Sequence, residues 1–202
     1  MPAIILAAGA SRRLGQPKQL VRVGDETLLG WTIRVARESG LDSVFVVLGA
    51  HSEHILAAVD MSCVQTILND NWEQGIASSI RVGVEAILEG DAEATSLMLL
   101  VCDQPRLSAN HLRALIMAQT QAHEHAPGSA IVASRYADIV GIPAIFPASQ
   151  FANLLALQGD SGARSLLRGS ASPVVEVEFY GGEIDVDLPS DLEVALRQDC
   201  PH

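Results

Sequence analysis

Short runs of mainly aliphatic residues alternate along this chain with longer segments in which apolar residues recur at helical spacing. Such runs are typical of strands that are buried on both faces of a sheet. They cover residues 3–7, 44–48, 64–68, 97–101, 130–133 and 174–177. Strands that alternate with helices in this way form βαβ units around a mostly parallel sheet. The alternation therefore predicts an α/β fold of three layers.

The segments between these runs predict helices, and several of their ends carry capping or stop residues. Gly40 follows the first of them, Ser108 can cap the fourth, and Pro189 suits the first turn of the last. The expected helices cover residues 27–39, 52–59, 78–89, 108–122 and 189–198. Residues 123–129 are expected to form a surface loop, because they contain a proline and a glycine.

Length, hydrophobic content and charge limit the class of protein. With 202 residues, of which 49% are hydrophobic, the chain can bury one sizeable core, so we expect a single domain over residues 1–202. No apolar run reaches the roughly 18 to 20 residues that a spanning helix needs, and residues 1–9 lack the basic start of a signal peptide, which favours a cytoplasmic protein. The net charge of -11 disfavours binding to nucleic acid or to an anionic membrane, because both would repel the chain.

The three cysteines, Cys63, Cys102 and Cys200, are far apart and odd in number. Their spacing fits neither a disulfide framework nor a zinc site, so we expect buried thiols. Because the chain is acidic overall, any anionic ligand must be met by a local positive site.

A stretch of small residues follows the first expected strand, at the carboxyl edge where open α/β sheets bind ligands. It reads Leu6-Ala7-Ala8-Gly9-Ala10-Ser11-Arg12-Arg13-Leu14-Gly15-Gln16-Pro17-Lys18. Small side chains let the backbone approach a ligand, successive N–H groups can form a nest for phosphate oxygens, and Arg13 and Lys18 add positive charge. The stretch is neither a Walker A loop nor Gly-x-Gly-x-x-Gly. Its residues alone allow an anion-binding loop or an ordinary strand-to-helix turn with solvated arginines.

Further polar residues follow other expected strands at the same edge. Asp103 comes just after residues 97–101, where its carboxylate could hold a hard cation such as Mg²⁺ or serve only as a turn residue. Gly75 permits a tight turn, and Ser78 or Ser79 could donate hydrogen bonds to a nucleotide or merely cap a helix. Both alternatives stay open for each of these positions.

The last third of the chain holds two more candidate segments. In Gly159-Asp160-Ser161-Gly162-Ala163-Arg164, the Arg164 side chain could bind an acceptor phosphate in a bidentate way, or the segment could simply cap a helix that starts near Ala163. Asp187 follows an expected strand end and could be a second carboxylate on Mg²⁺ or a helix cap.

Six blocks of this sequence, in consistent order, resemble the nucleotidyltransferases of the molybdopterin cytidylyltransferase and guanylyltransferase group, the MobA/MocA-like family. The blocks are the loop 6–18, the Asn-x-x-Trp-x-x-Gly-x-x-x-Ser-like segment 69–79, Asp-Gln-Pro at 103–105, Gly-x-Pro-x-x-Phe at 141–146, Gly-Asp-x-Gly-Ala-Arg at 159–164, and the closing segment 184–192. The resemblance implies a three-layer α/β/α Rossmann-like nucleotidyltransferase fold with a mostly parallel mixed sheet.

The resemblance also implies roles for individual residues. It places the nucleotide on Leu6, Ala7, Ala8, Gly9, Ser11, Arg13, Lys18, Asn71, Gly75, Ser78, Ser79 and Asp103. It places the acceptor on Gly141, Pro143, Asp160 and Arg164, and Mg²⁺ on Asp103 and Asp187. Catalysis would depend on Arg13, Lys18 and Asp103, through the leaving pyrophosphate and the metal.

The reaction that the resemblance implies is transfer of CMP from CTP to the phosphate of molybdenum cofactor, with release of pyrophosphate. The product would serve a molybdenum hydroxylase. Ala8 favours CTP over GTP, because the guanylyltransferase branch usually has a glycine at that place. The alternatives are a guanylyltransferase, a nucleotidyltransferase for another phosphorylated acceptor, and a carrier or insertion factor for the cofactor without catalysis. An oxidoreductase-like role lacks a nicotinamide or flavin fingerprint.

Overall fold

A computed structural model describes residues 1–41, 43–125, 128, 130–169, 172–186 and 191. Its main sheet has seven strands in the order β5-β4-β1-β6-β8-β7-β9. These strands are β1 (Ala3–Ala7), β4 (Val44–Leu48), β5 (Gln65–Leu68), β6 (Ser96–Val101), β7 (Ile131–Tyr136), β8 (Ile139–Pro147) and β9 (Val174–Glu178). β1 pairs in parallel with β4 and β6, and β4 with β5, whereas β8 is antiparallel to both β6 and β7. The sheet is therefore mixed and mostly parallel, which confirms the predicted fold class.

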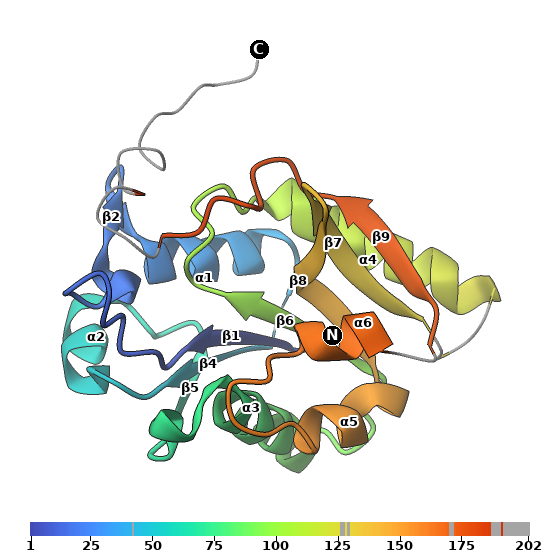
Figure 1. The fold of residues 1–202 in the computed structure, drawn as a ribbon, viewed down its shortest axis with the longest axis horizontal. Coiled ribbons are helices and arrows are strands. Elements are labelled where there is room, and N and C mark those ends of the chain that lie inside the picture. The colour runs from blue at the N-terminus through green and yellow to red at the C-terminus, as the bar shows by residue number, and fades with distance from the viewer. Residues whose placement is uncertain (42, 126–127, 129, 170–171, 187–190, 192–202) are drawn as a thin grey trace.

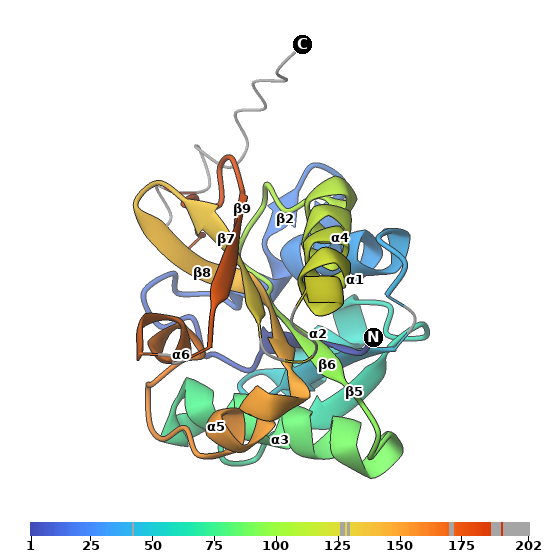
Figure 2. The same cartoon turned by 90° about the vertical axis from the view of Figure 1, so that its right-hand side faces the viewer.

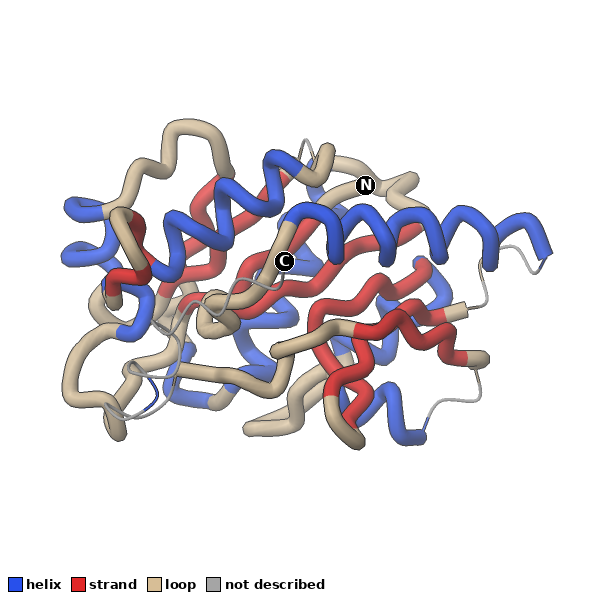
Figure 3. The backbone as a smooth tube through the Cα atoms, turned by 90° about the horizontal axis from the view of Figure 1, so that it is seen from above, coloured by secondary structure: helices blue, strands red, loops and turns tan. Residues whose placement is uncertain are grey.

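Helices cover both faces of this sheet. They are α1 (Leu28–Glu38), α2 (Ser52–Ala58), α3 (Ile76–Gly90), α4 (Ala109–His125), α5 (Phe151–Leu155) and α6 (Arg164–Gly169). α1 and α4 lie on one side of the sheet, and α3 and α5 on the other (Figures 1 and 2). The view from above shows helices of the first side lying over the strands (Figure 3). Among the described residues, none of the helices is long and apolar enough to cross a membrane.

Shorter elements complete the chain. They are the 3-10 helices η1 (Lys18–Leu20), η2 (Trp72–Gln74) and η3 (Ala148–Gln150), and the two-stranded ribbon of β2 (Arg22–Val23) and β3 (Glu26–Thr27). η1 and η2 each follow a loop that leaves the carboxyl end of a parallel strand, β1 and β5 respectively. These two short helices therefore lie where ligands bind in open α/β sheets.

The core is divided by the sheet into two apolar layers. Successive side chains of β1 point to opposite faces, so Ile5 packs in the layer of α1 and α4, while Ile4 and Leu6 pack in the layer of α3. All five residues of β1 and of β4 are buried. Burial on both faces accounts for the uninterrupted aliphatic runs that predicted these two strands.

The main departure from the sequence-based expectation is β8, which was not predicted. Gly141, Pro143 and Pro147 interrupt its apolar pattern and read as loop residues, yet the strand fills the sheet between β6 and β7. β5 and β9 are edge strands with exposed residues, and not strands buried on both faces.

Two smaller expectations were also wrong. The loop expected over residues 123–129 begins later, because α4 continues to His125. Cys102 is buried as expected, but Cys63 is exposed. Cys200, the helix expected over 189–198 except for residue 191, and residues 126–127 and 129 lie outside the described residues.

Candidate functional site

The loop after β1 is closed on itself by Ser11. Ser11 has a positive φ of 51°, which turns the chain, and its carbonyl accepts the backbone N–H of Leu14 at 3.0 Å. Its hydroxyl accepts the backbone N–H of Lys18, also at 3.0 Å. Ser11 thus fixes where Lys18 leaves the loop and enters η1.

Gln19, which sequence reasoning missed, anchors the same loop from inside. Its side chain is fully buried, and its Nε2 donates to the carbonyls of Ala7 at 2.6 Å and Gly9 at 3.0 Å. Because a trans peptide places C=O and the following N–H on opposite sides, the N–H groups of Ala8 and Ala10 point away from Gln19. Gln19 thus anchors the loop from one side and leaves these two N–H groups on the other side.

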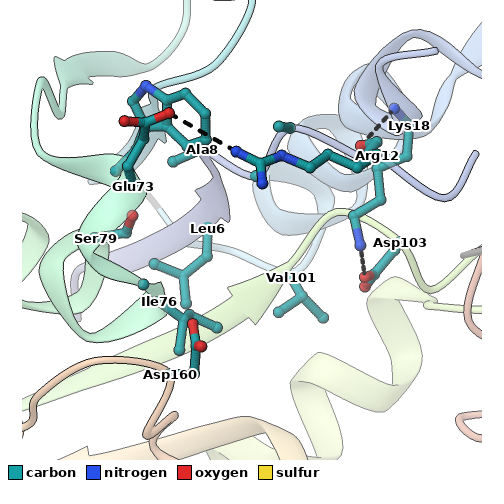
Figure 4. A pocket seen from close by; sticks show the side chains of 15 residues that line it. Leu6, Ala8, Arg12, Lys18, Glu73, Ile76, Ser79, Val101, Asp103 and Asp160 are labelled. Carbon is teal, nitrogen blue, oxygen red and sulfur yellow. Dashed lines mark hydrogen bonds and ion pairs between the residues drawn. The ribbon is translucent and has the colours of Figure 1, made fainter. Parts of the chain in front are cut away.

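A cleft of about 430 Å³ opens beside this loop (Figure 4). The residues predicted for the site that line it are Leu6, Ala8, Gly9, Ser11, Lys18, Gly75, Ser79, Asp103 and Asp160. They come from the ends of β1 and β6, from the start of α3 and from the segment before α6. Residues that are more than a hundred positions apart in sequence thus meet in one concave site, and its size suits a small-molecule ligand.

Lys18 and Asp103 form an ion pair at one side of this cleft (Figure 4). The lysine and aspartate side chains are 20% and 16% exposed, so the pair is partly shielded from water. A carboxylate at the end of a central strand is a fitting oxygen ligand for a hard divalent cation. The Lys18 ammonium contacts that carboxylate.

The chain approaches Asp103 again near its end. Val186 donates its backbone N–H to the carbonyl of Asp103 at 3.0 Å. Asp187, predicted as a second metal ligand, is the next residue and lies outside the described residues. Within the part of the chain that the structure describes, no three His, Cys, Asp or Glu side chains are grouped as a metal site. Mg²⁺ is commonly held by only one or two carboxylates together with substrate phosphates.

The two loop arginines line two adjoining cavities. Arg12, which sequence reasoning did not single out, lines the main cleft and pairs with Glu73 at 3.8 Å (Figure 4). Both side chains of this pair are largely exposed, so the pair adds little stability. Arg13 lines an adjoining cavity of about 200 Å³ together with Ser11 and Lys18. The two cavities share loop residues: Arg12 lines both of them, and Arg13 lines the smaller one.

The first turn of α3 and the segment before it form one wall of the cleft. Ser78 is buried, and its hydroxyl is hydrogen bonded to the carbonyls of Asn71 at 3.0 Å and Gly75 at 2.8 Å. Ser79 lines the cleft and accepts a hydrogen bond from Asn69 at 3.0 Å. Asn71 is exposed and is not among the residues that line the cleft. The Ser78 hydroxyl is thus used in contacts within the protein, and α3 has no side-chain cap at its first turn.

Gly75 allows a close approach between two loops of the site. Its φ is +96°, and a Cβ there would lie 2.4 Å from the backbone of Gly159. The Gly159 carbonyl accepts the backbone N–H of Ala77 at 3.1 Å. This contact holds Asp160 against the cleft, although the sequence comparison with the family had placed it on the acceptor side.

The other predicted acceptor residues lie next to the cleft and do not line it. Gly141 and Pro143 are buried in β8. Gln104, directly after Asp103, donates to the carbonyls of Ile142 at 3.1 Å and Gly182 at 3.2 Å, and so connects β8 to the Asp103 side of the site. Arg164 is half-buried at the start of α6, and its buried Nε has no hydrogen-bond partner among the described residues.

Cys102 does not take part in this chemistry. Burial, with a smaller contribution from the charge of Asp103, raises the pKa of its thiol to about 12. The thiol is therefore protonated at neutral pH and is neither a nucleophile nor a metal ligand.

The chain matches a known protein family and several known proteins. The family described as "MobA-like NTP transferase domain" matches residues 3–175. The chain is 30% identical to the purine catabolism protein PucB of Bacillus subtilis, over 96% of this chain and 95% of that protein. It is 31% identical to nicotine blue oxidoreductase of Paenarthrobacter nicotinovorans, over 82% and 80% of the two chains. A probable molybdenum cofactor guanylyltransferase of Opitutus terrae is 31% identical over 52% of this chain and 48% of that one.

Solved structures show the same architecture. The crystal structure of Rv0371c from Mycobacterium tuberculosis has a TM-score of 0.84 at 34% identity, and 96% of each chain is covered. A manganese complex of Rv0371C has a TM-score of 0.80 at 31% identity, with 98% of each chain covered. The Rossmann-like nucleotidyltransferase fold is thus shared over nearly the whole chain.

Proposed function

This chain belongs to the MobA-like NTP transferase domain family, and we propose that it transfers CMP from CTP to the phosphate of molybdenum cofactor, releasing pyrophosphate. The observation that carries the proposal is the meeting of the small-residue loop, Lys18 and Asp103 in one cleft. An anion nest, a cation and a metal-binding carboxylate are the parts that nucleotidyl transfer from a triphosphate needs.

In this reaction an oxygen of the acceptor phosphate attacks the α-phosphorus, and the bond from that phosphorus to the β-phosphate oxygen breaks. The bonding electrons leave with pyrophosphate, and a phosphoanhydride forms. No covalent enzyme intermediate and no general base are needed, because the acceptor phosphate is already ionised. Catalysis is then positioning and stabilisation of charge.

The loop residues supply most of that stabilisation. N–H groups of the loop and the ammonium of Lys18 hold the β- and γ-phosphates, where negative charge grows as pyrophosphate leaves. Arg13, in the adjoining cavity, and Arg12, which lines both cavities, add positive charge beside the loop. When the triphosphate binds, the ammonium of Lys18 would move from the Asp103 carboxylate to the β- and γ-phosphates.

Asp103 would hold Mg²⁺, and Asp187 is proposed as a second carboxylate. When bound, the ion neutralises phosphate charge and makes the α-phosphorus a better electrophile. The release of Asp103 by Lys18 would couple metal binding to nucleotide binding. The manganese complex of the related Rv0371C supports a divalent cation for this site.

The choice of molybdenum cofactor rests on relatives. The guanylyltransferase relative is named for molybdenum cofactor, and the PucB relative for purine catabolism. The second name supports delivery of the product to a molybdenum hydroxylase, because such enzymes oxidise purines. Ala8 lines the cleft, and the resemblance of its loop to the cytidylyltransferase branch supports CTP as the nucleotide.

A guanylyltransferase is the second candidate, and the Opitutus terrae relative favours it. Pyrophosphate release by the purified protein with Mg²⁺ and molybdenum cofactor, measured for CTP, GTP, ATP and UTP, separates the two. Release that is selective for CTP and abolished in Asp103→Ala supports the proposal. Selectivity for GTP would move the protein to the guanylyltransferases. Tight cofactor binding without release from any nucleotide would instead indicate a carrier.

A further inference from the structure

The loop that carries Asp160 is held against the start of α3. Its carbonyl at Gly159 accepts the backbone N–H of Ala77 at 3.1 Å, and the turn over residues 158–161 is closed by a backbone hydrogen bond, also of 3.1 Å. A Cβ on Gly75 would lie only 2.7 Å from Oδ1 of Asp160. The carboxylate is therefore placed directly beside Gly75, at the wall of the cleft.

This carboxylate is not engaged by the protein. Asp160 is exposed and lines the cleft, and in the described part of the chain its side chain has no hydrogen-bond or ion-pair partner. The neighbouring carboxylates are both paired. Glu73 contacts Arg12, and Asp103 contacts Lys18. Asp160 thus offers a hydrogen-bond acceptor to whatever occupies the cleft.

The charged groups separate the two ends of the cleft. Figure 4 shows the pair of Lys18 and Asp103 at one end, and Asp160 with Ile76 and Ser79 away from it. With the triphosphate and Mg²⁺ at the Lys18 end, the nucleoside extends toward Asp160. A carboxylate repels the phosphates of both substrates, so Asp160 is complementary to the nucleoside and not to the acceptor phosphate.

The side chains near Asp160 favour the base over the ribose. Ile76 is 38% exposed although it is apolar, and it lines the cleft together with Leu6 and Val101. Apolar walls with a few polar groups are typical of sites for flat ring systems, whose faces are apolar and whose edges carry donors and acceptors. The Asp160 oxygens are then available to a donor on the edge of the base.

We propose that Asp160 is a specificity-determining residue for the nucleotide: its carboxylate accepts a hydrogen bond from the exocyclic amino group of cytosine. Acidic side chains are the usual partners of this amino group. The inference rests on the proposed function and adds to it the residue that distinguishes CTP from UTP. Uracil has a carbonyl oxygen in place of the amine, and this oxygen would face the carboxylate with no proton between them.

Ser79 complements this contact. Its hydroxyl accepts a hydrogen bond from Asn69 at 3.0 Å, so its own proton can be donated to a ligand in the cleft. Cytosine has a ring nitrogen that accepts hydrogen bonds directly beside its amino group. One acceptor and one donor of the cleft therefore match two adjacent groups of this base.

Asp160→Asn tests the proposal, because it keeps the size of the side chain and adds an N–H donor that uracil can use. The ratio of kcat/KM for CTP to that for UTP should fall about ten- to a hundredfold. Glu73→Gln is the matched control, since it also removes one negative charge from the cleft. It should change kcat/KM equally for the two nucleotides and leave their ratio constant.

A binding measurement without acceptor gives a readout that does not depend on turnover. Calorimetry with Mg²⁺ compares CTP with the triphosphate of 4-deaminocytidine, which lacks only the amino group. The wild-type protein should bind the analogue about tenfold more weakly or worse. Asp160→Ala, which has no acceptor, should bind the two ligands with nearly equal affinity, because the partner of the amine is gone.

Three results would overturn the inference while the proposed function stands. They are an unchanged ratio of CTP to UTP in Asp160→Asn, equal affinity of the wild-type protein for CTP and its 4-deamino analogue, and loss in Asp160→Ala of discrimination against 2′-deoxy-CTP alone, which would place the carboxylate on the ribose. A wild-type protein that binds GTP in preference to CTP, or that transfers no nucleotide to molybdenum cofactor, would instead overturn the proposed function, and the inference with it.

Discussion

Replacing Gln19 with leucine should weaken both the fold and the nucleotide site. The substitution removes the hydrogen bonds from Nε2 to the carbonyls of Ala7 and Gly9 and leaves side-chain volume nearly unchanged. Ala7 is 2% exposed, so its carbonyl loses a donor that water does not easily replace, at about 1–3 kcal/mol. Gly9 is exposed, and its carbonyl can bind water instead.

One feature of Gln19 reduces this cost. Its Oε1 is buried without a partner among the described residues, and leucine removes that unpaired atom. The net loss in the free energy of unfolding should therefore be about 1–2 kcal/mol. In a chain of 202 residues this corresponds to a melting temperature lower by about 2–8 °C.

The functional loss should exceed what the stability loss alone would cause. Without Gln19 the loop no longer holds the N–H groups of Ala8 and Ala10 toward the phosphates, so the KM for CTP should rise about tenfold and that for the acceptor should stay constant. Denaturation curves and steady-state kinetics measure the two effects. Gln16→Leu, an exposed glutamine in the same loop, is the control and should change neither. A Gln19→Leu protein with wild-type KM for CTP would refute the assigned role of this anchor.

Three further perturbations have defined outcomes. Lys18→Met should lower turnover about 10²- to 10³-fold. It should also tighten Mn²⁺ binding in calorimetry without nucleotide, because Asp103 loses its competing cation; unchanged Mn²⁺ affinity would contradict the pairing. Gly75→Ala, at φ +96° and 2.4 Å from a neighbouring loop, should cost about 1–3 kcal/mol in urea unfolding, whereas Gly90→Ala, in open space, should not destabilise. Burial lowers the pKa of His111 from 6.5 to about 4. As the pH falls, this histidine is therefore protonated in the unfolded chain before it is protonated in the folded chain. A stabilisation of about 3 kcal/mol, fully present above pH 6.5, is lost as the pH falls toward 4. The slope of stability against pH in that range should be smaller in His111→Gln, and an equal slope would disprove the assignment.

Much of the fold could be predicted because parallel strands that are buried on both faces require continuous aliphatic runs. The bounds of β1 and β4 were predicted to the residue for this reason. β8 was missed because it is antiparallel and contains Gly141 and Pro143, which local rules assign to loops. Its place is decided by contacts with β6 and β7, which are distant in sequence.

The site was predicted in its main parts for a related reason. Loops after parallel strands converge at one edge of the sheet, so Lys18 and Asp103 could be expected to meet without knowledge of the register. Arg12, which lines both cavities, was missed, and it directly follows Ser11, whose positive φ no local rule predicts for a serine.

The supporting residues of the site carried no recognisable pattern. Gln19 looks like a solvated residue of a short helix, and only the closure of the loop over it makes it an anchor. Tyr136 is the last residue of β7, and its close packing against Gly141 and Gly182 can be recognised only when the backbone is known.

The central claim is nucleotide transfer to the phosphate of molybdenum cofactor, and the mass of the product tests it most directly. The purified protein, incubated with CTP, Mg²⁺ and molybdenum cofactor, should yield the cofactor enlarged by one CMP, together with an equal amount of pyrophosphate. Asp103→Ala should yield neither. A cofactor of unchanged mass, with or without hydrolysis of CTP, would contradict the account.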